Sequence, residues 1–181
     1  MDNTKGKLPF ILVSPIEKFS IELSVKVGDA VGDFFGYPIK VLSLLQEIDF
    51  AFNFDRDQYH STLILEKLAN LAPERCLKIL ALTNRDLFIP ILTHVYGEAQ
   101  LNGIACIVST NRLNTDLQFS KNKVLERIIK ESIHELGHTF NLRHCKDHSC
   151  IMHYCRSLED VDLKSNNYCR YCEVLLSDAM N

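Results

Sequence analysis

The sequence predicts an α/β (α+β) fold, a single domain built on a twisted mixed sheet, and three observations support this prediction. In the first half, short apolar runs alternate with amphipathic helical periodicity, which is typical of parallel βαβ units. Residues 93–109 then contain two short apolar runs separated by Gly and Asn, which predicts a sharp reversal with at least one antiparallel strand. The tail after residue 144 is rich in Cys and His and too short for a core of its own.

The first strand and helix follow from the opening apolar pattern. Residues 8–13 predict a short buried strand. The segment Ser14-Pro15-Ile16-Glu17 has the form of a capping box with Pro at the first helical position. Apolar residues then recur at spacings of three and four, which predicts a helix that ends at Gly36.

The same alternation continues as far as residue 83. Residues 39–45 predict a second strand, Asp57 is a candidate cap for a second helix that ends before Pro73, and residues 78–83 predict a third strand. Strands that alternate with helices in this way predict parallel pairing with right-handed crossovers.

The second half begins with two short predicted strands, residues 93–96 and 104–109. A polar stretch, residues 110–122, then leads into a long helix. One side of that helix is apolar at Val124, Leu125, Ile128, Ile129 and Ile133.

The end of this helix carries the most informative motif, His134-Glu135-Leu-Gly-His138, with His144 beyond it. Positions four apart lie on one helix face, so His134 and His138 can bind one metal ion together. Glu135 lies beside them, where it can act as the general base of a zinc hydrolase. His144 would complete three protein ligands and leave one zinc position open for water, as catalytic zinc sites do. The alternative is an exposed helix end that carries three histidines by chance.

His144 can reach the same metal only if the chain leaves the helix. In a continuous helix of about 100° per residue, His144 would point about 80° away from His134 and about 120° away from His138. Helices commonly end on a residue in the left-handed conformation, Gly first and Asn second. We therefore expect a left-handed Asn141 and a turn that brings His144 back.

Five of the seven cysteines fall between Cys145 and Cys172. An odd number of cysteines in a chain expected to be cytosolic disfavours a disulfide framework. The pairs Cys145-x4-Cys150 and Cys169-x2-Cys172 resemble the spacing of zinc ribbons, in which four thiolates hold one structural ion. Reduced structural cysteines, or disulfides formed on oxidation, are the alternatives, and Cys155 can replace one of the four.

Composition narrows the range of partners and locations. The net charge of −3 gives no support for nucleic-acid binding. No apolar run approaches the roughly 20 residues that span a bilayer, and the N-terminal residues lack the h-region and cleavage site of a signal peptide. We therefore expect a cytoplasmic monomer that binds neither nucleic acid nor a membrane. Cys76 and Cys106 lie in predicted core segments, where buried apolar roles are expected.

Together these motifs resemble the archaemetzincin family of the metzincin zinc metallopeptidases. Segment 134–144, with the spacing H-E-x-x-H-x-x-N-x-x-H, is similar to the metzincin motif, which has Gly where this chain has Asn141. Segment 145–172, with C-x4-C-x-M followed by C-x2-C, and segment 88–113 are similar to the archaemetzincin family. Sixteen residues separate Met152 from Cys169, one fewer than the family spacing.

The resemblance implies a compact, zincin-like metzincin domain with an active-site helix and a small zinc-bound C-terminal lobe. Within the single domain 1–181 it separates an N-terminal sheet and helix subdomain, residues 1–141, from a Cys-rich subdomain, residues 142–181. Two zinc ions are implied, one catalytic and one structural. The implied site residues are Glu135 as catalytic base, His134, His138 and His144 on the catalytic zinc, and Cys145, Cys150, Cys169 and Cys172 on the structural zinc.

Three further features follow from the resemblance. Met152 would form the Met-turn, an apolar base beneath the histidine ligands. The strand near residues 103–109 would be the sheet edge that binds an extended peptide or protein substrate. Tyr154 resembles a metzincin tyrosine that hydrogen-bonds near the zinc, with ordinary packing as the alternative.

The expected activity is peptide-bond hydrolysis, in which Glu135 accepts a proton from the attacking water and returns it to the leaving amine. Two alternatives stay open. A zinc-stabilised binding or structural module with little activity would have its fourth zinc position filled by a protein side chain. A zinc amidase acting on a small substrate would have a closed pocket rather than an exposed edge strand.

Overall fold

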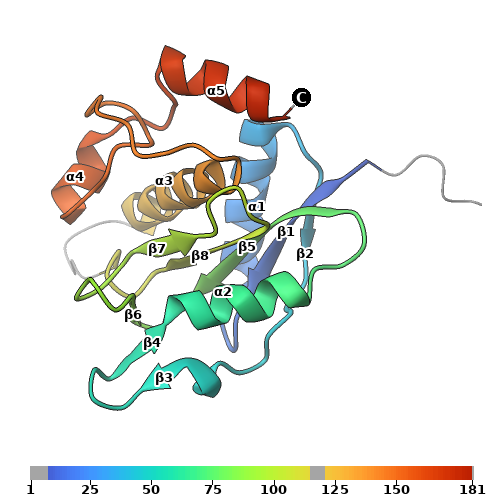
Figure 1. The fold of residues 1–181 in the computed structure, drawn as a ribbon, viewed down its shortest axis with the longest axis vertical. Coiled ribbons are helices and arrows are strands. Elements are labelled where there is room, and N and C mark those ends of the chain that lie inside the picture. The colour runs from blue at the N-terminus through green and yellow to red at the C-terminus, as the bar shows by residue number, and fades with distance from the viewer. Residues whose placement is uncertain (1–7, 115–120, 181) are drawn as a thin grey trace, which may run out of the picture.

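The computed structural model describes residues 8–114 and 121–180, in which helices cover both faces of a central sheet (Figure 1). Residues 1–7, at the N-terminus where no signal peptide was expected, and residues 115–120 of the polar stretch lie outside the described residues. The elements are, in chain order, β1 (Phe10–Pro15), α1 (Ile21–Phe35), β2 (Ile39–Val41), the 3-10 helix η1 (Asp49–Ala51), β3 (Phe52–Asn53), β4 (Gln58–His60), α2 (Ser61–Asn70), β5 (Cys76–Thr83), β6 (Leu87–Phe88), β7 (Gly97–Ala99), β8 (Ala105–Ser109), α3 (Lys121–Thr139), α4 (Leu158–Leu163) and α5 (Arg170–Met180).

The central sheet has the strand order β2-β1-β5-β8-β7. β1 pairs in parallel with both β2 and β5, and β5 pairs in parallel with β8. β7 pairs antiparallel with β8, so the sheet is mixed. The predicted α/β class with one antiparallel strand is therefore confirmed.

The strand residues alternate between two apolar cores because successive side chains point to opposite faces of a sheet. On one face, Ile11, Val13 and Leu80 pack with α1 and α3. On the other face, Leu12 and Ile79 pack with α2. α3 lies along β7 and β8, which places the predicted zinc helix directly behind the sheet edge (Figure 1).

The predicted capping box at Ser14 is wrong. Ser14 and Pro15 continue β1 beside Ala81 and Leu82, and Ser14 Oγ accepts a hydrogen bond of 3.0 Å from Leu44 N rather than capping a helix. Helix α1 instead begins after Ser20, whose side chain accepts a hydrogen bond from Leu23 N. The predicted end is confirmed, since Gly36 caps α1 in the left-handed conformation.

The predicted cap at Asp57 is also wrong. Asp57 has a positive φ of 53° and lies in the turn between β3 and β4. The chain first forms the short strand β4, because Tyr59 and His60 pair with β6 in a second, three-stranded sheet that the sequence did not reveal. Helix α2 then begins at Ser61.

The sheet edge is β7, not the strand near residues 103–109. β8 covers most of that predicted strand and lies inside the sheet, between β5 and β7. The predicted strand at residues 93–96 is displaced as well, because the antiparallel partner of β8 is Gly97–Ala99. An edge strand is a template for a further extended chain, so a substrate pairing along this edge would meet β7.

The Cys-rich tail forms two helices that the sequence did not predict, α4 and α5. Ser157 and Asp160 make a capping box at the start of α4, and Cys172 is the buried residue of α5. Within the described residues, no helix is both long and apolar enough to span a membrane.

Candidate active site

Helix α3 and the turn after it bring the three predicted histidines together. The Nε2 atoms of His134 and His138 lie 3.1 Å apart, and one nitrogen of each of the three histidines lies within 4.8 Å of the others. Two nitrogen ligands about 2.0–2.1 Å from a tetrahedral zinc lie roughly 3.3 Å apart. The donor set and spacing therefore fit one zinc ion.

His144 reaches this cluster because α3 ends as predicted. Asn141 has a φ of 67°, the left-handed conformation expected for it. Its N–H donates to His138 O at 2.9 Å, and Leu142 N donates to Gly137 O at 3.0 Å. These bonds close the helix end, and the reversed chain places the His144 ring 4.8 Å from the His138 ring.

Backbone carbonyls orient two of the imidazoles. His134 Nδ1 lies 2.8 Å from Ile151 O, and His138 Nδ1 lies 2.7 Å from Leu142 O. A carbonyl can only accept, so each Nδ1 carries the proton and leaves Nε2 free to bind a metal. Burial lowers the pKa of His138 to about 4 and lowers the pKa values of His134 and His144. Near neutral pH the rings are therefore in the neutral form that binds zinc.

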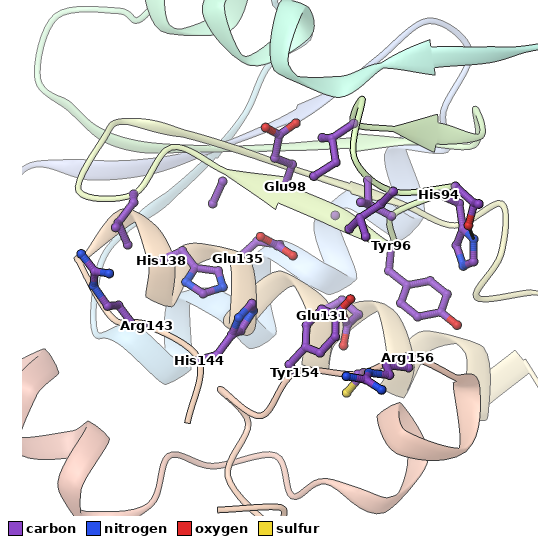
Figure 2. Close-up of a pocket in the computed structure, with 18 residues that line it drawn as sticks. His94, Tyr96, Glu98, Glu131, Glu135, His138, Arg143, His144, Tyr154 and Arg156 are labelled. Carbon is purple, nitrogen blue, oxygen red and sulfur yellow. Dashed lines mark hydrogen bonds between the residues drawn. The ribbon is translucent and has the colours of Figure 1, made fainter. Parts of the chain in front are cut away.

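Glu135 packs against the edge strand (Figure 2). A methyl group at Gly97 would lie 2.7 Å from Glu135 Cγ and 2.8 Å from its Oε1, so only glycine allows this approach. Burial raises the pKa of Glu135 well above its usual value, the Glu131 and Glu98 carboxylates raise it further, and the Lys164 ammonium lowers it. A bound zinc ion would also lower this pKa, because its positive charge favours the carboxylate.

Met152 is fully buried beneath α3, as a Met-turn requires. A methyl group at Gly137 would lie 2.6 Å from Met152 Sδ and 2.9 Å from Tyr168 Oη, so the thioether contacts the helix backbone between the two histidines. Tyr168 Oη donates a hydrogen bond of 3.2 Å to Ile133 O. These contacts attach the C-terminal lobe to the underside of the histidine cluster.

A cavity of about 660 Å³ opens in front of α3. β7, α3 and the segment after residue 152 line it, and Glu135, His138 and His144 face it (Figure 2). Tyr154 also lines the cavity with its ring 5.0 Å from the His144 ring. Three lining or supporting residues were missed in the sequence: Gly97, Glu131 and, behind Glu131, Lys164.

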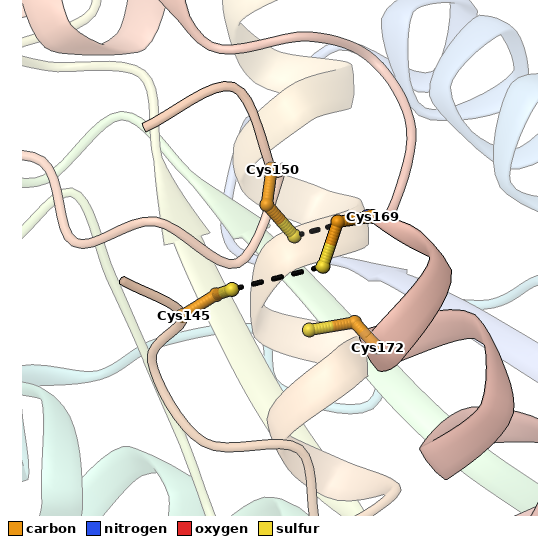
Figure 3. A group of neighbouring side chains, drawn as sticks. All are labelled: Cys145, Cys150, Cys169 and Cys172. Atoms are coloured by element: carbon orange, nitrogen blue, oxygen red, sulfur yellow. Dashed lines mark hydrogen bonds between the residues drawn. The ribbon is translucent and has the colours of Figure 1, made fainter. Parts of the chain in front are cut away.

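The four predicted cysteines meet in a second group beside α3 (Figure 3). Their sulfur atoms lie within 4.8 Å of one another, and Cys145 Sγ lies 3.7 Å from Cys169 Sγ. Two thiolates about 2.3 Å from a tetrahedral zinc lie roughly 3.8 Å apart. Cys169 N also points to Cys150 Sγ at 3.3 Å, so the group fits a closed structural zinc site.

The other cysteines stand apart from both groups. Cys106 is fully buried as expected, whereas Cys76 is only partly buried. Cys155 does not join the four-cysteine group and instead lines the cavity beside Arg156. All seven cysteines are free thiols in the structure, which therefore does not contain the disulfides named as an alternative.

Histidines on a buried helix, beside an edge strand and an open cavity, define the class of zinc-dependent metallopeptidases. The chain belongs to peptidase family M54, whose model matches residues 12–178. The resemblance seen in the sequence is thereby confirmed.

Relatives and solved structures agree with this assignment. The chain is 36% identical over 172 residues to an archaemetzincin of Methanopyrus kandleri, an alignment that covers 94% of this chain and 90% of that protein. It is 34% identical to an archaemetzincin of Methanocaldococcus jannaschii, with 93% of each chain covered. The crystal structure of the Methanopyrus kandleri archaemetzincin matches with a TM-score of 0.83 at 34% identity, covering 94% of this chain and 95% of that one. A zinc-dependent peptidase from Methanocorpusculum labreanum matches with a TM-score of 0.82 at 28% identity, covering 92% and 99%.

Proposed function

We propose that this zinc metallopeptidase hydrolyses peptide bonds with Glu135 as general base and with His134, His138 and His144 as the ligands of a catalytic zinc. The convergence of three neutral imidazoles on one point, with a buried carboxylate beside them, carries this proposal. Among the described His, Cys, Asp and Glu side chains, none joins the three histidines as a fourth ligand, which leaves a position for water. This favours a catalytic site over the alternative of a purely structural module.

A zinc ion bound there would lower the pKa of a coordinated water toward about 7 and polarise the scissile carbonyl. Glu135 accepts the proton of the attacking water, because its carboxylate lies beside the histidine cluster and is held by the close contact with Gly97. Glu135 then passes that proton to the leaving amine. Burial of Glu135 excludes bulk water from this transfer.

The substrate proposed is an extended peptide that pairs with β7. β7 is the last strand of the sheet on the cavity side, so one side of its backbone has no strand partner among the described elements. The cavity runs along this strand, and all three β7 residues, Gly97, Glu98 and Ala99, line it. This supports a peptide over the small-molecule substrate of an amidase.

We also propose a second, structural zinc on Cys145, Cys150, Cys169 and Cys172, and one domain in which residues 142–181 form the Cys-rich subdomain. One apolar core includes Ile11 and Val108 from the sheet together with Met152 and Cys172 from the tail, which supports a single cooperative unit. The cytoplasmic location and the monomeric state stay predictions.

A direct test compares zinc-loaded wild type with Glu135→Gln on a library of extended peptides. Both proteins should contain two zinc ions per chain by elemental analysis, because Glu135 is not a proposed ligand. Only wild type should release peptide products, seen by mass spectrometry. Equal cleavage by both proteins would remove Glu135 as the base.

A further inference from the structure

A second glutamate of α3 faces the same cavity one helical turn before Glu135. Glu131 and Glu135 are four residues apart and therefore lie on one helix face. Glu131 is only 4% exposed, yet it lines the cavity near Tyr96 and Tyr154 (Figure 2). The carboxylate of Glu131 therefore forms part of the cavity wall one helical turn away from Glu135, where it can contact a polar group of a substrate.

Lys164 holds this carboxylate from behind. Its Nζ lies 2.7 Å from Glu131 Oε1, and the lysine is 1% exposed. Burial lowers the pKa of Lys164, but the surrounding acidic groups, Glu131 first, raise it more, so the net shift of that pKa is upward. The ammonium is therefore charged and fully enclosed, so a ligand in the cavity meets Glu131 and not Lys164.

The segment that carries Lys164 is itself fixed to α3. Lys130 Nζ donates to the carbonyls of Val161 and Asp162 at 3.2 Å each. Arg127 donates to both carboxylate oxygens of Asp162 at 2.8 and 2.7 Å. Glu131 is thus held in one position before any substrate arrives, which reduces the entropy lost on binding.

The Glu131 carboxylate has capacity for a further donor. Among the described residues, its recorded partner is Lys164 alone, through Oε1. A carboxylate accepts several hydrogen bonds, and a poorly hydrated one gains most from a cationic donor. The nearby Glu135 and Glu98 carboxylates repel an acidic group. The cations that line the cavity, Arg143 and Arg156, are exposed, so solvent and salt screen them.

We propose that Glu131 is a specificity-determining residue whose carboxylate binds the ammonium or guanidinium group of a substrate Lys or Arg side chain next to the scissile bond. This inference rests on the proposed peptidase function, because it assigns the substrate class of that same cavity. Lys164 is the positioning residue that holds Glu131.

The test uses zinc-loaded protein and peptides of one parent sequence in which each position in turn carries Lys, Met or Glu. Wild type should cleave the best Lys peptide with a kcat/KM about 10- to 100-fold above its Met counterpart, the range of a charge-assisted hydrogen bond. Glu131→Gln should reduce this ratio to within about threefold of one. Because Glu131→Gln leaves the buried Lys164 unpaired, a double variant, Glu131→Met with Lys164→Met, removes both charges and retains the packing volume.

Glu98→Gln is the matched control. Glu98 also lines the cavity, but its Oε1 accepts a hydrogen bond of 2.8 Å from Thr62 Oγ1 at the other wall. If Glu131 binds the cation directly, Glu98→Gln keeps the Lys preference. Equal loss in both variants would assign the preference to the overall negative field and overturn the proposal, as would a wild type that cleaves Lys and Met peptides equally.

A binding measurement separates this proposal from the peptidase proposal. Zinc-loaded Glu135→Gln should bind the Lys peptide more tightly than the Met peptide by calorimetry, and the added Glu131→Gln substitution should abolish the difference. A binding preference without any turnover in wild type would overturn the proposed hydrolysis and leave the subsite standing. Turnover without a preference would overturn the subsite alone.

Discussion

Gly97→Ala should disable turnover without disturbing the metal sites. The added methyl group would lie 2.7 Å from both Glu135 Cγ and Ile107 O, whereas ordinary contacts lie at 3.4–4 Å. Ile107 O belongs to the backbone of the buried strand β8, so β7 has to shift away from it. The Glu135 side chain has to move as well, by roughly 0.7 Å to restore contact distance. A misplacement on the order of 1 Å can lower a rate about 100-fold, which corresponds to about 2.7 kcal/mol of activation free energy.

The assay is kcat/KM for a cleaved peptide, with zinc content measured on the same sample. Gly28→Ala is the matched control: its methyl group would lie 2.9 Å from Ile39 Cγ2, a similar crowding in the core behind the sheet. Gly28→Ala should lower the stability of the protein, while the folded protein should keep a kcat/KM close to that of wild type. If Gly97→Ala retained wild-type kcat/KM within about threefold, strand β7 would not hold the base in position.

Three further outcomes are expected. Cys169→Ser should reduce the zinc content from two ions to one per chain. It should also lower the melting temperature, because a structural zinc site contributes directly to folding. An unchanged zinc content would exclude Cys169 as a ligand. Asp162→Ala should lower the free energy of unfolding by about 3 kcal/mol, since it removes one charge partner of the buried Arg127. Glu22→Gln, in an exposed pair, should leave the urea midpoint almost unchanged; equal midpoints for the two variants would contradict this. Burial raises the pKa of Cys155 to about 11, and because only the thiolate reacts, its alkylation rate should keep rising with pH up to about 10; a plateau near pH 9 would contradict the raised pKa.

The sequence predicted most of the histidine site because that site is local. His134, Glu135 and His138 share one helix, and their geometry follows from the helical repeat. Asn141 added the one backbone feature needed to bring His144 back, and its left-handed conformation is present. The four cysteines are farther apart in the chain, but their spacing is typical enough of zinc binding to be read without a structure.

The parts that the sequence did not predict depend on distant contacts. Ser14 and Pro15 are residue types that often begin a helix, yet both belong to strand β1, because they pair with β5. The resemblance implied an edge strand near residues 103–109, and nothing local in the sequence shows that β7 continues the sheet beyond β8. Gly97 and Lys164 act through residues 38 and 33 positions away, Glu135 and Glu131, so no motif marks them.

The central claim concerns three imidazole nitrogens and one solvent position around a zinc ion. A crystal structure of the zinc-loaded protein, with anomalous data collected at the zinc edge, tests it most directly. The account predicts two zinc peaks, one of them about 2.0–2.1 Å from nitrogens of His134, His138 and His144 and bonded to a solvent molecule beside Glu135. A zinc that lacks His144, or one whose fourth ligand is a protein side chain, would contradict it.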